Sequence, residues 1–174
     1  MNQIKSIAIK KGLTSKVAQF AVIVGIATIA PLLKQQAVTG SLVNAMLFVA
    51  VVVLGAKGAI LAALTPSLIA LSVGLLPVVL APMIPFIMVG NVILILAFDY
   101  LRKKSYWLAA VFASVLKFLF LFSTSSVVID LLIKKELSSA VAGMMNLPQL
   151  FTALGGSLLA FLFLAARKPR QGGG

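Results

Sequence analysis

The sequence contains no cysteine and no histidine, and only three acidic residues among 174. Without cysteine, disulfides and thiolate ligands are excluded, and without histidine the commonest nitrogen ligand for zinc or haem is missing. Three carboxylates leave little for paired acid–base catalysis or for a metal cage. We therefore predict that the chain is not an enzyme and that it binds no metal or cofactor.

Hydrophobic residues, by contrast, make up 61% of the chain, and charged residues only 10%. A soluble domain of this length cannot bury so much apolar surface, because small globular proteins keep a large wetted fraction. Several runs of about 20 apolar residues are long enough to cross a bilayer as helices. The composition predicts an all-α, multi-pass protein of the cell (plasma) membrane, with the lipid bilayer as its surroundings.

Apolar runs separated by basic clusters, glycines and prolines predict a single bundle of six transmembrane helices. A basic leader, 1–16, precedes this membrane domain, 17–168, and a flexible tail, 169–174, follows it. The polar segment 127–145 is predicted to be an outer loop, partly helical as a cap. The predicted spans are residues 17–33, 39–56, 59–80, 83–101, 106–125 and 146–166.

The first apolar run has a competing interpretation as a signal peptide, because a basic region precedes it. The run is long, however, and the sequence AVTG at 37–40 is a poor cleavage site. We therefore interpret it as the first transmembrane span.

The net charge of +12 is concentrated at the ends of the apolar runs. With a cytoplasmic N-terminus, eleven lysines and arginines face the cytoplasm and three (Lys34, Lys134 and Lys135) face outward. The positive-inside rule then places both termini in the cytoplasm. Nucleic-acid binding is not predicted, since it needs an extended basic surface that this chain lacks.

Polar side chains of the last three spans fall in the outer half of the bilayer in this orientation. At a rise of about 1.5 Å per residue, Asn91 and Lys117 both lie roughly 12 Å below the outer boundary. Asn146 and Gln149 lie in the first turn of the last span, and Ser123 lies near the outer end of the fifth. A charge in hydrocarbon costs about 2.5–3.5 kcal/mol and normally faces a cavity or a partner. These five residues are the predicted substrate-binding site.

Structural interpretations of the same residues remain open. The Lys117 ammonium can snorkel along its stem to the outer headgroups, or it can pair with Asp130. The amides can serve as hydrogen-bonding links between helices. Asp99, close to Arg102 and Lys103, is expected to form only a solvated ion pair at the inner boundary.

Small residues spaced one helical turn apart occur in three spans. Ala21 and Gly25 lie in the first span, and two further pairs, Ala109 with Ala113 and Gly156 with Ala160, lie in the fifth and sixth. Such spacing allows close helix approach in a membrane. Each pair therefore marks either internal packing or a docking surface for another membrane subunit.

Two motifs carry a family resemblance: PFIMVGN, which opens the fourth span, and MNLPQLFTALGGSLLA, which opens the sixth. With the chain's size, its six spans and the small-residue face of its first helix, they make residues 10–168 resemble the substrate-binding S components of energy-coupling factor (ECF) transporters. The metal-transporting branch of that family is excluded, because its histidine-containing N-terminal site is absent here.

The resemblance implies a subunit that binds a vitamin or a vitamin precursor near the outer surface. It also implies docking of the first helix, through Ala21 and Gly25, on a transmembrane coupling subunit driven by two cytoplasmic ATPases. Glycine replaces the family's usual alanine at the second position of this pair. The short first loop, KQQAVTG, implies that 126–145 contributes more of the cap.

The predicted pocket contains a cation, amides and hydroxyls, and Asp130 is its one candidate for a buried acid. This combination suits a neutral or an anionic small organic molecule, and a carboxylate meeting Lys117 would form a strong charge-assisted hydrogen bond. The alternative function is a structural or assembly membrane protein that transports no solute. In that case Lys117 would snorkel and the small-residue faces would only pack the bundle.

Overall fold

The computed structural model describes residues 2–74, 78–132 and 142–167, which are almost entirely helical and include no strand. The all-α prediction is therefore confirmed. A further helical turn at 142–145 precedes the last helix. The elements are α1 (Asn2–Ile29), η1 (Ala30–Leu33), α2 (Gln36–Ser72), η2 (Val78–Met83), α3 (Ile84–Leu101), α4 (Tyr106–Leu132) and α6 (Leu147–Ala166).

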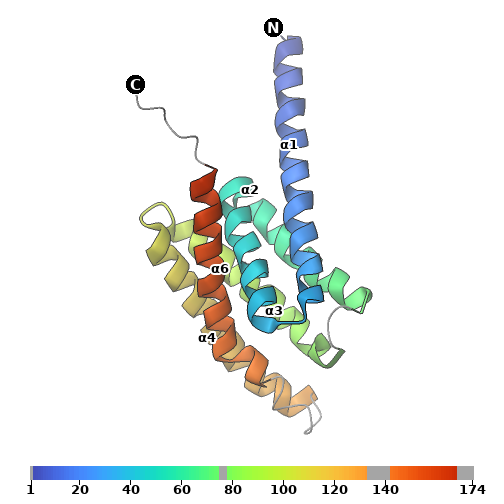
Figure 1. Cartoon of the computed structure of the whole chain (residues 1–174), viewed down its shortest axis with the longest axis vertical. Coiled ribbons are helices and arrows are strands. Elements are labelled where there is room, and N and C mark those ends of the chain that lie inside the picture. Colours follow the sequence, from blue (N-terminus) through green and yellow to red (C-terminus); the bar gives the residue numbers. More distant parts are fainter. Residues whose placement is uncertain (1, 75–77, 133–141, 168–174) are drawn as a thin grey trace.

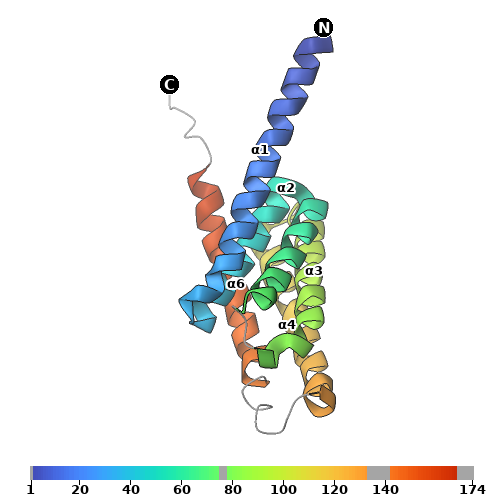
Figure 2. The same ribbon diagram turned by 90° about the vertical axis from the view of Figure 1, so that its right-hand side faces the viewer.

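The long helix α2 is two arms joined at Gly55, whose backbone (φ 78°, ψ 172°) is not helical. This conformation is readily available only to glycine, and the chain reverses there (Figures 1 and 2). Five of the helices are long and apolar enough to cross a membrane, and α2 is one of them. Because α2 consists of the arms 36–54 and 56–72, the bundle contains six long helical segments, the number that the sequence predicts.

Two predicted boundaries are wrong. The third span ends at Ser72 rather than Leu80, because the chain leaves the helix at Gly74 (φ 71°). The fifth span continues to Leu132, through residues predicted to form a loop. Apart from Asp130, residues 127–132 are apolar and contain neither glycine nor proline, so nothing in them stops the helix. The rest of the predicted cap, 133–141, and the predicted tail lie outside the described residues.

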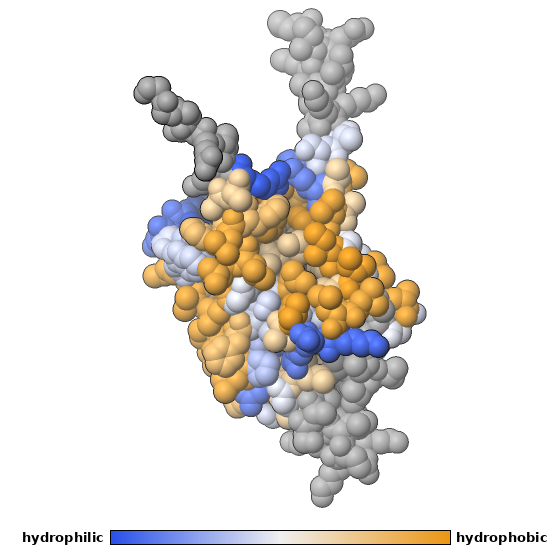
Figure 3. All heavy atoms as spheres, in the orientation of Figure 1, coloured by the Kyte–Doolittle hydropathy of each residue, from blue (hydrophilic) through white to orange (hydrophobic). Residues whose placement is uncertain are grey.

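The helix α1 begins, and α6 ends, at the same end of the molecule (Figures 1 and 2). The reversal at Gly55 and the turn between α3 and α4 lie at this end as well, where Arg102 binds Asp99 at 2.9 Å as predicted. The opposite end, called the distal end below, holds the α1–α2 turn and the start of α6. Hydrophilic residues gather at two levels with a broad hydrophobic belt between them (Figure 3). This is the architecture of a membrane-embedded helical bundle.

The core lies between α2, α3, α4 and α6. Phe48 and Phe98 are fully buried and meet edge to face, with ring centroids 4.8 Å apart. The small residues Ala109, Ala113 and Ala160 are buried in the same cluster, so the pairs in the fifth and sixth spans serve internal packing. Ala21 and Gly25 differ from them, since both are exposed on α1.

A close helix contact occurs where Gly156 of α6 meets α2. A β-carbon at this position would lie 2.8 Å from the backbone of Ser41 and of Ala45, where no flexible side chain can move aside. Gly40 makes the matching close approach to Thr152 of α6. The two glycines therefore set the spacing between α2 and α6.

We expect Gly156→Ala to lower the free energy of unfolding by about 1–3 kcal/mol, the usual cost of overpacking. Thermal unfolding in detergent measures the effect. Gly25→Ala is the matched control, because a β-carbon there meets nothing within 4 Å. Equal melting temperatures for the two variants would contradict the close packing of α6 on α2.

Candidate functional site

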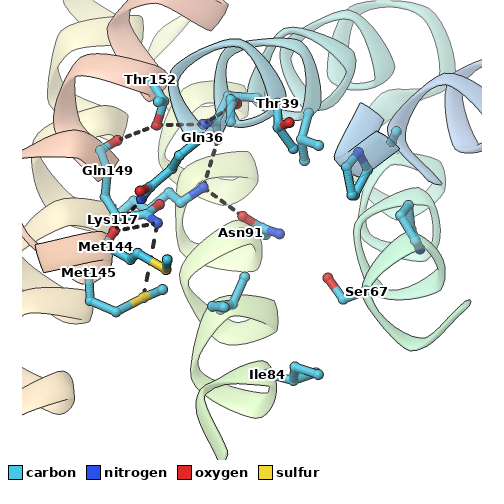
Figure 4. A pocket seen from close by; sticks show the side chains of 17 residues that line it. Gln36, Thr39, Ser67, Ile84, Asn91, Lys117, Met144, Met145, Gln149 and Thr152 are labelled. Carbon is cyan, nitrogen blue, oxygen red and sulfur yellow. Dashed lines mark hydrogen bonds between the residues drawn. The ribbon is translucent and has the colours of Figure 1, made fainter. Parts of the chain in front are cut away.

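A cavity of about 170 Å³ lies in the distal half of the bundle, where its lining includes the end of α1 and the starts of α2, α3 and α6. The helices α2, α3, α4 and α6 contribute its polar side chains, and the end of α1 and residues 144–145 complete the wall (Figure 4). Its lining combines polar residues (Gln36, Thr39, Asn44, Ser67, Asn91, Lys117, Gln149 and Thr152) with apolar or small ones (Ala27, Pro31, Gly40, Val43, Pro66, Ile84, Ile87, Met144 and Met145). A mainly apolar pocket with a few placed polar groups is typical of small-molecule sites.

Lys117 provides the central cation of this cavity. Its side chain is only 3% exposed, and its Nζ donates hydrogen bonds to Asn44 Oδ1 at 2.6 Å and to Asn91 Oδ1 at 2.7 Å. Distances this short are those of charge-assisted bonds. Three helices, α2, α3 and α4, are therefore joined at one ammonium group.

This geometry differs from both structural alternatives for Lys117. The ammonium does not extend along the helix to the headgroups, because it is held between two amide oxygens. It cannot pair with Asp130 either. Since α4 continues without a break, their separation of thirteen positions places the two α-carbons about 20 Å apart along the helix axis.

Asn44 is the functional candidate that the sequence prediction missed. It is 2% exposed, and its Nδ2 donates to the Gly40 carbonyl at 2.8 Å and to Thr152 Oγ1 at 3.5 Å. The network around Lys117 thus reaches α6 through Asn44. A signal was present, since Asn44 is an isolated amide in an apolar run, and the depth argument used for Asn91 applies equally to the second span.

Gln149 also lines the cavity, where its Nε2 donates to the Met144 carbonyl at 3.1 Å. Gln36, at the start of α2, donates to the same carbonyl at 2.9 Å. These two amides connect the starts of α2 and α6, both at the distal end, to the segment 144–145. Of the five predicted site residues, the structure therefore brings Asn91, Lys117 and Gln149 together.

The other two predicted residues do not line the cavity. Asn146 is exposed, and its Oδ1 accepts a hydrogen bond from the Leu147 amide at 2.8 Å as the N-cap of α6. This is a helix-capping role, typical of asparagine before a first-turn proline. Ser123 is also exposed, on a side of α4 that does not contribute to the lining.

Metal ligands are not grouped at this site. Among the residues that the structure describes, no three His, Cys, Asp or Glu side chains come together. The chemistry available in the cavity is that of hydrogen-bond donors, hydrogen-bond acceptors and one positive charge.

We expect Asn44→Ala to lower the free energy of unfolding by about 2 kcal/mol, because it removes a charge-assisted hydrogen bond and leaves a buried ammonium with one partner. Chemical or thermal unfolding in detergent measures this loss. Ser123→Ala, on the same end of the bundle, serves as the control and should unfold as the wild type does. An Asn44→Ala protein of unchanged stability would contradict the network described above.

Comparisons with protein-family models, with curated proteins and with solved structures give no match for this chain. The resemblance to ECF S components therefore stays a prediction from the sequence motifs, and the case for function rests on the cavity itself.

Proposed function

We propose that this protein is the membrane-embedded substrate-binding subunit of an importer, and that it captures a small organic solute in the cavity around Lys117. The observation that carries the proposal is a buried lysine lining a cavity in a bundle whose remaining interior is largely apolar. An ionisable group at membrane depth is costly, and it usually marks a solute pathway or binding site.

The proposed orientation follows the distribution of basic residues. With both termini in the cytoplasm of a plasma-membrane protein, the distal end faces outward, and the cavity lies on the side from which a solute arrives. Lys57 and the cluster Arg102, Lys103 and Lys104 then lie at the cytoplasmic boundary, as the positive-inside rule requires.

In an ECF-type mechanism, the exposed face of α1 would be the docking surface for a partner subunit. Ala21 and Gly25 are exposed, and beside them lies an apolar groove of about 270 Å³ between α1, α2 and α6. Small residues beside an apolar groove suit the close approach of another membrane helix. We propose that a transmembrane coupling subunit, powered by cytoplasmic ATPases, docks on this face.

A structural or assembly role is the alternative, and one observation favours it. Lys117, Asn44 and Asn91 join three helices, so the network stabilises the bundle whether or not a solute binds. The two functions differ in one measurable respect, since only the first requires a retained small molecule.

We expect native mass spectrometry of gently solubilised protein to detect a bound small organic compound. Lys117→Ala should weaken its binding by more than tenfold, about 1.4 kcal/mol, because a charge-assisted hydrogen bond is lost. Ser123→Ala should retain the compound fully, since that side chain lies outside the cavity. A wild-type protein that never carries a solute would favour the structural role.

The docking proposal has its own test. Replacing Ala21 and Gly25 together by leucine should abolish co-purification with a coupling subunit and its ATPases from native membranes, because bulky side chains block close helix approach. Solute binding should persist, since neither residue lines the cavity. Undiminished co-purification would remove this face of α1 from the proposed interface.

A further inference from the structure

The described lining of the cavity includes one basic side chain and no acidic one. The basic side chain is that of Lys117. Of the three acidic residues in the chain, Asp99 is paired with Arg102, Asp130 lies about 20 Å away along α4, and Glu136 is outside the described residues. Within the described part of the chain, only neutral dipoles face the ammonium.

Lys117 and Asn91 also have N–H groups for which no described residue is the acceptor. A lysine ammonium has three N–H groups, and the described residues accept from two of them, through Asn44 and Asn91. Because Asn91 Oδ1 accepts from Lys117, the amide nitrogen of Asn91 points away from it (Figure 4). No described residue accepts a hydrogen bond from that nitrogen, although the side chain is 3% exposed and lines the cavity. Lys117 thus fixes the orientation in which Asn91 presents its donors.

We propose that the cavity selects a small organic acid, whose carboxylate is the missing counter-charge of Lys117 and accepts hydrogen bonds from Lys117 Nζ and Asn91 Nδ2. This inference rests on the proposed function and specifies its substrate class. The apolar part of the acid lies against Ile84, Ile87 and Met145. The volume of about 170 Å³ is below the roughly 300 Å³ at which drug-sized ligands begin to fit, so the acid is small.

Other charge states fit the cavity less well. A cationic solute would meet an uncompensated ammonium at short range, where repulsion in a low-dielectric site is strong. A neutral solute that displaced water from the cavity would leave the buried charge with dipoles alone, and an unpaired buried charge is costly. A carboxylate supplies both the opposite charge and the acceptor oxygens.

Asn91→Asp is the variant that tests this inference most directly. It keeps the size of the side chain, but it replaces the free amide donor with an oxygen and places a carboxylate where an oxygen now lies 2.7 Å from the ammonium. The protein would then carry its own counter-charge. Folding is not compromised, because a buried lysine gains an opposite charge, and the ligand-free variant should melt above the wild type.

The probe is a total small-molecule extract of cells, incubated with wild-type protein, Asn91→Asp and the control Ser123→Ala in detergent. Compounds retained after washing are identified by mass spectrometry. A second sample of the extract, in which carboxylic acids have been converted to methyl esters, provides the uncharged counterpart of each acid.

We expect wild type and Ser123→Ala to retain a carboxylic acid, Asn91→Asp to retain at least tenfold less of it, and the esterified extract to give no retention. Retention of a neutral or cationic compound, or equal retention by Asn91→Asp, would overturn the inference while leaving solute binding intact. A wild-type protein that retains nothing from either extract would refute the proposed function as well.

Discussion

A single buried ammonium group organises the distal half of this protein. Lys117 is 3% exposed, and two asparagine oxygens from neighbouring helices bind it. Amide dipoles satisfy the hydrogen-bonding needs of a cation without neutralising its charge. The two asparagines therefore hold the lysine in place without supplying the counter-charge that a carboxylate partner would bring.

The frame around this charge is set by close backbone contacts. Gly40 and Gly156 let α2 and α6 approach so closely that side chains are excluded from parts of their interface. Helix association in a bilayer lacks the hydrophobic drive of water and depends on such packing and on interhelical hydrogen bonds. Asn44 lies beside this contact and donates to Thr152 across it. The packing of α2 on α6 therefore also positions one of the two asparagines that accept hydrogen bonds from Lys117.

The number of passes, the reversal near Gly55 and the shared depth of Asn91, Lys117 and Gln149 could be predicted from the sequence. Each depends on local chemistry: apolar run length, glycine conformation and helical rise. The prediction for the end of α4 is wrong because it interprets the segment 127–145 as one polar unit, although the first six residues of this segment contain no signal that stops a helix. Asn44 could have been found by applying the depth argument to the second span. Which hydroxyls and amides turn inward, as Gln149 does and Ser123 does not, depends on the rotation of each helix against its neighbours, and helices with apolar residues all round carry little signal for this.

Two glutamine side chains bind the segment 144–145 through one backbone carbonyl. Gln36 and Gln149 both donate to the carbonyl of Met144, and this uses both lone pairs of one oxygen. Neutral hydrogen bonds of this kind contribute about 1 kcal/mol each, and Met145 adds apolar contacts, since it is buried in one cluster with Met83 and Val128. Residues 144–145 therefore form a fixed part of the cavity wall.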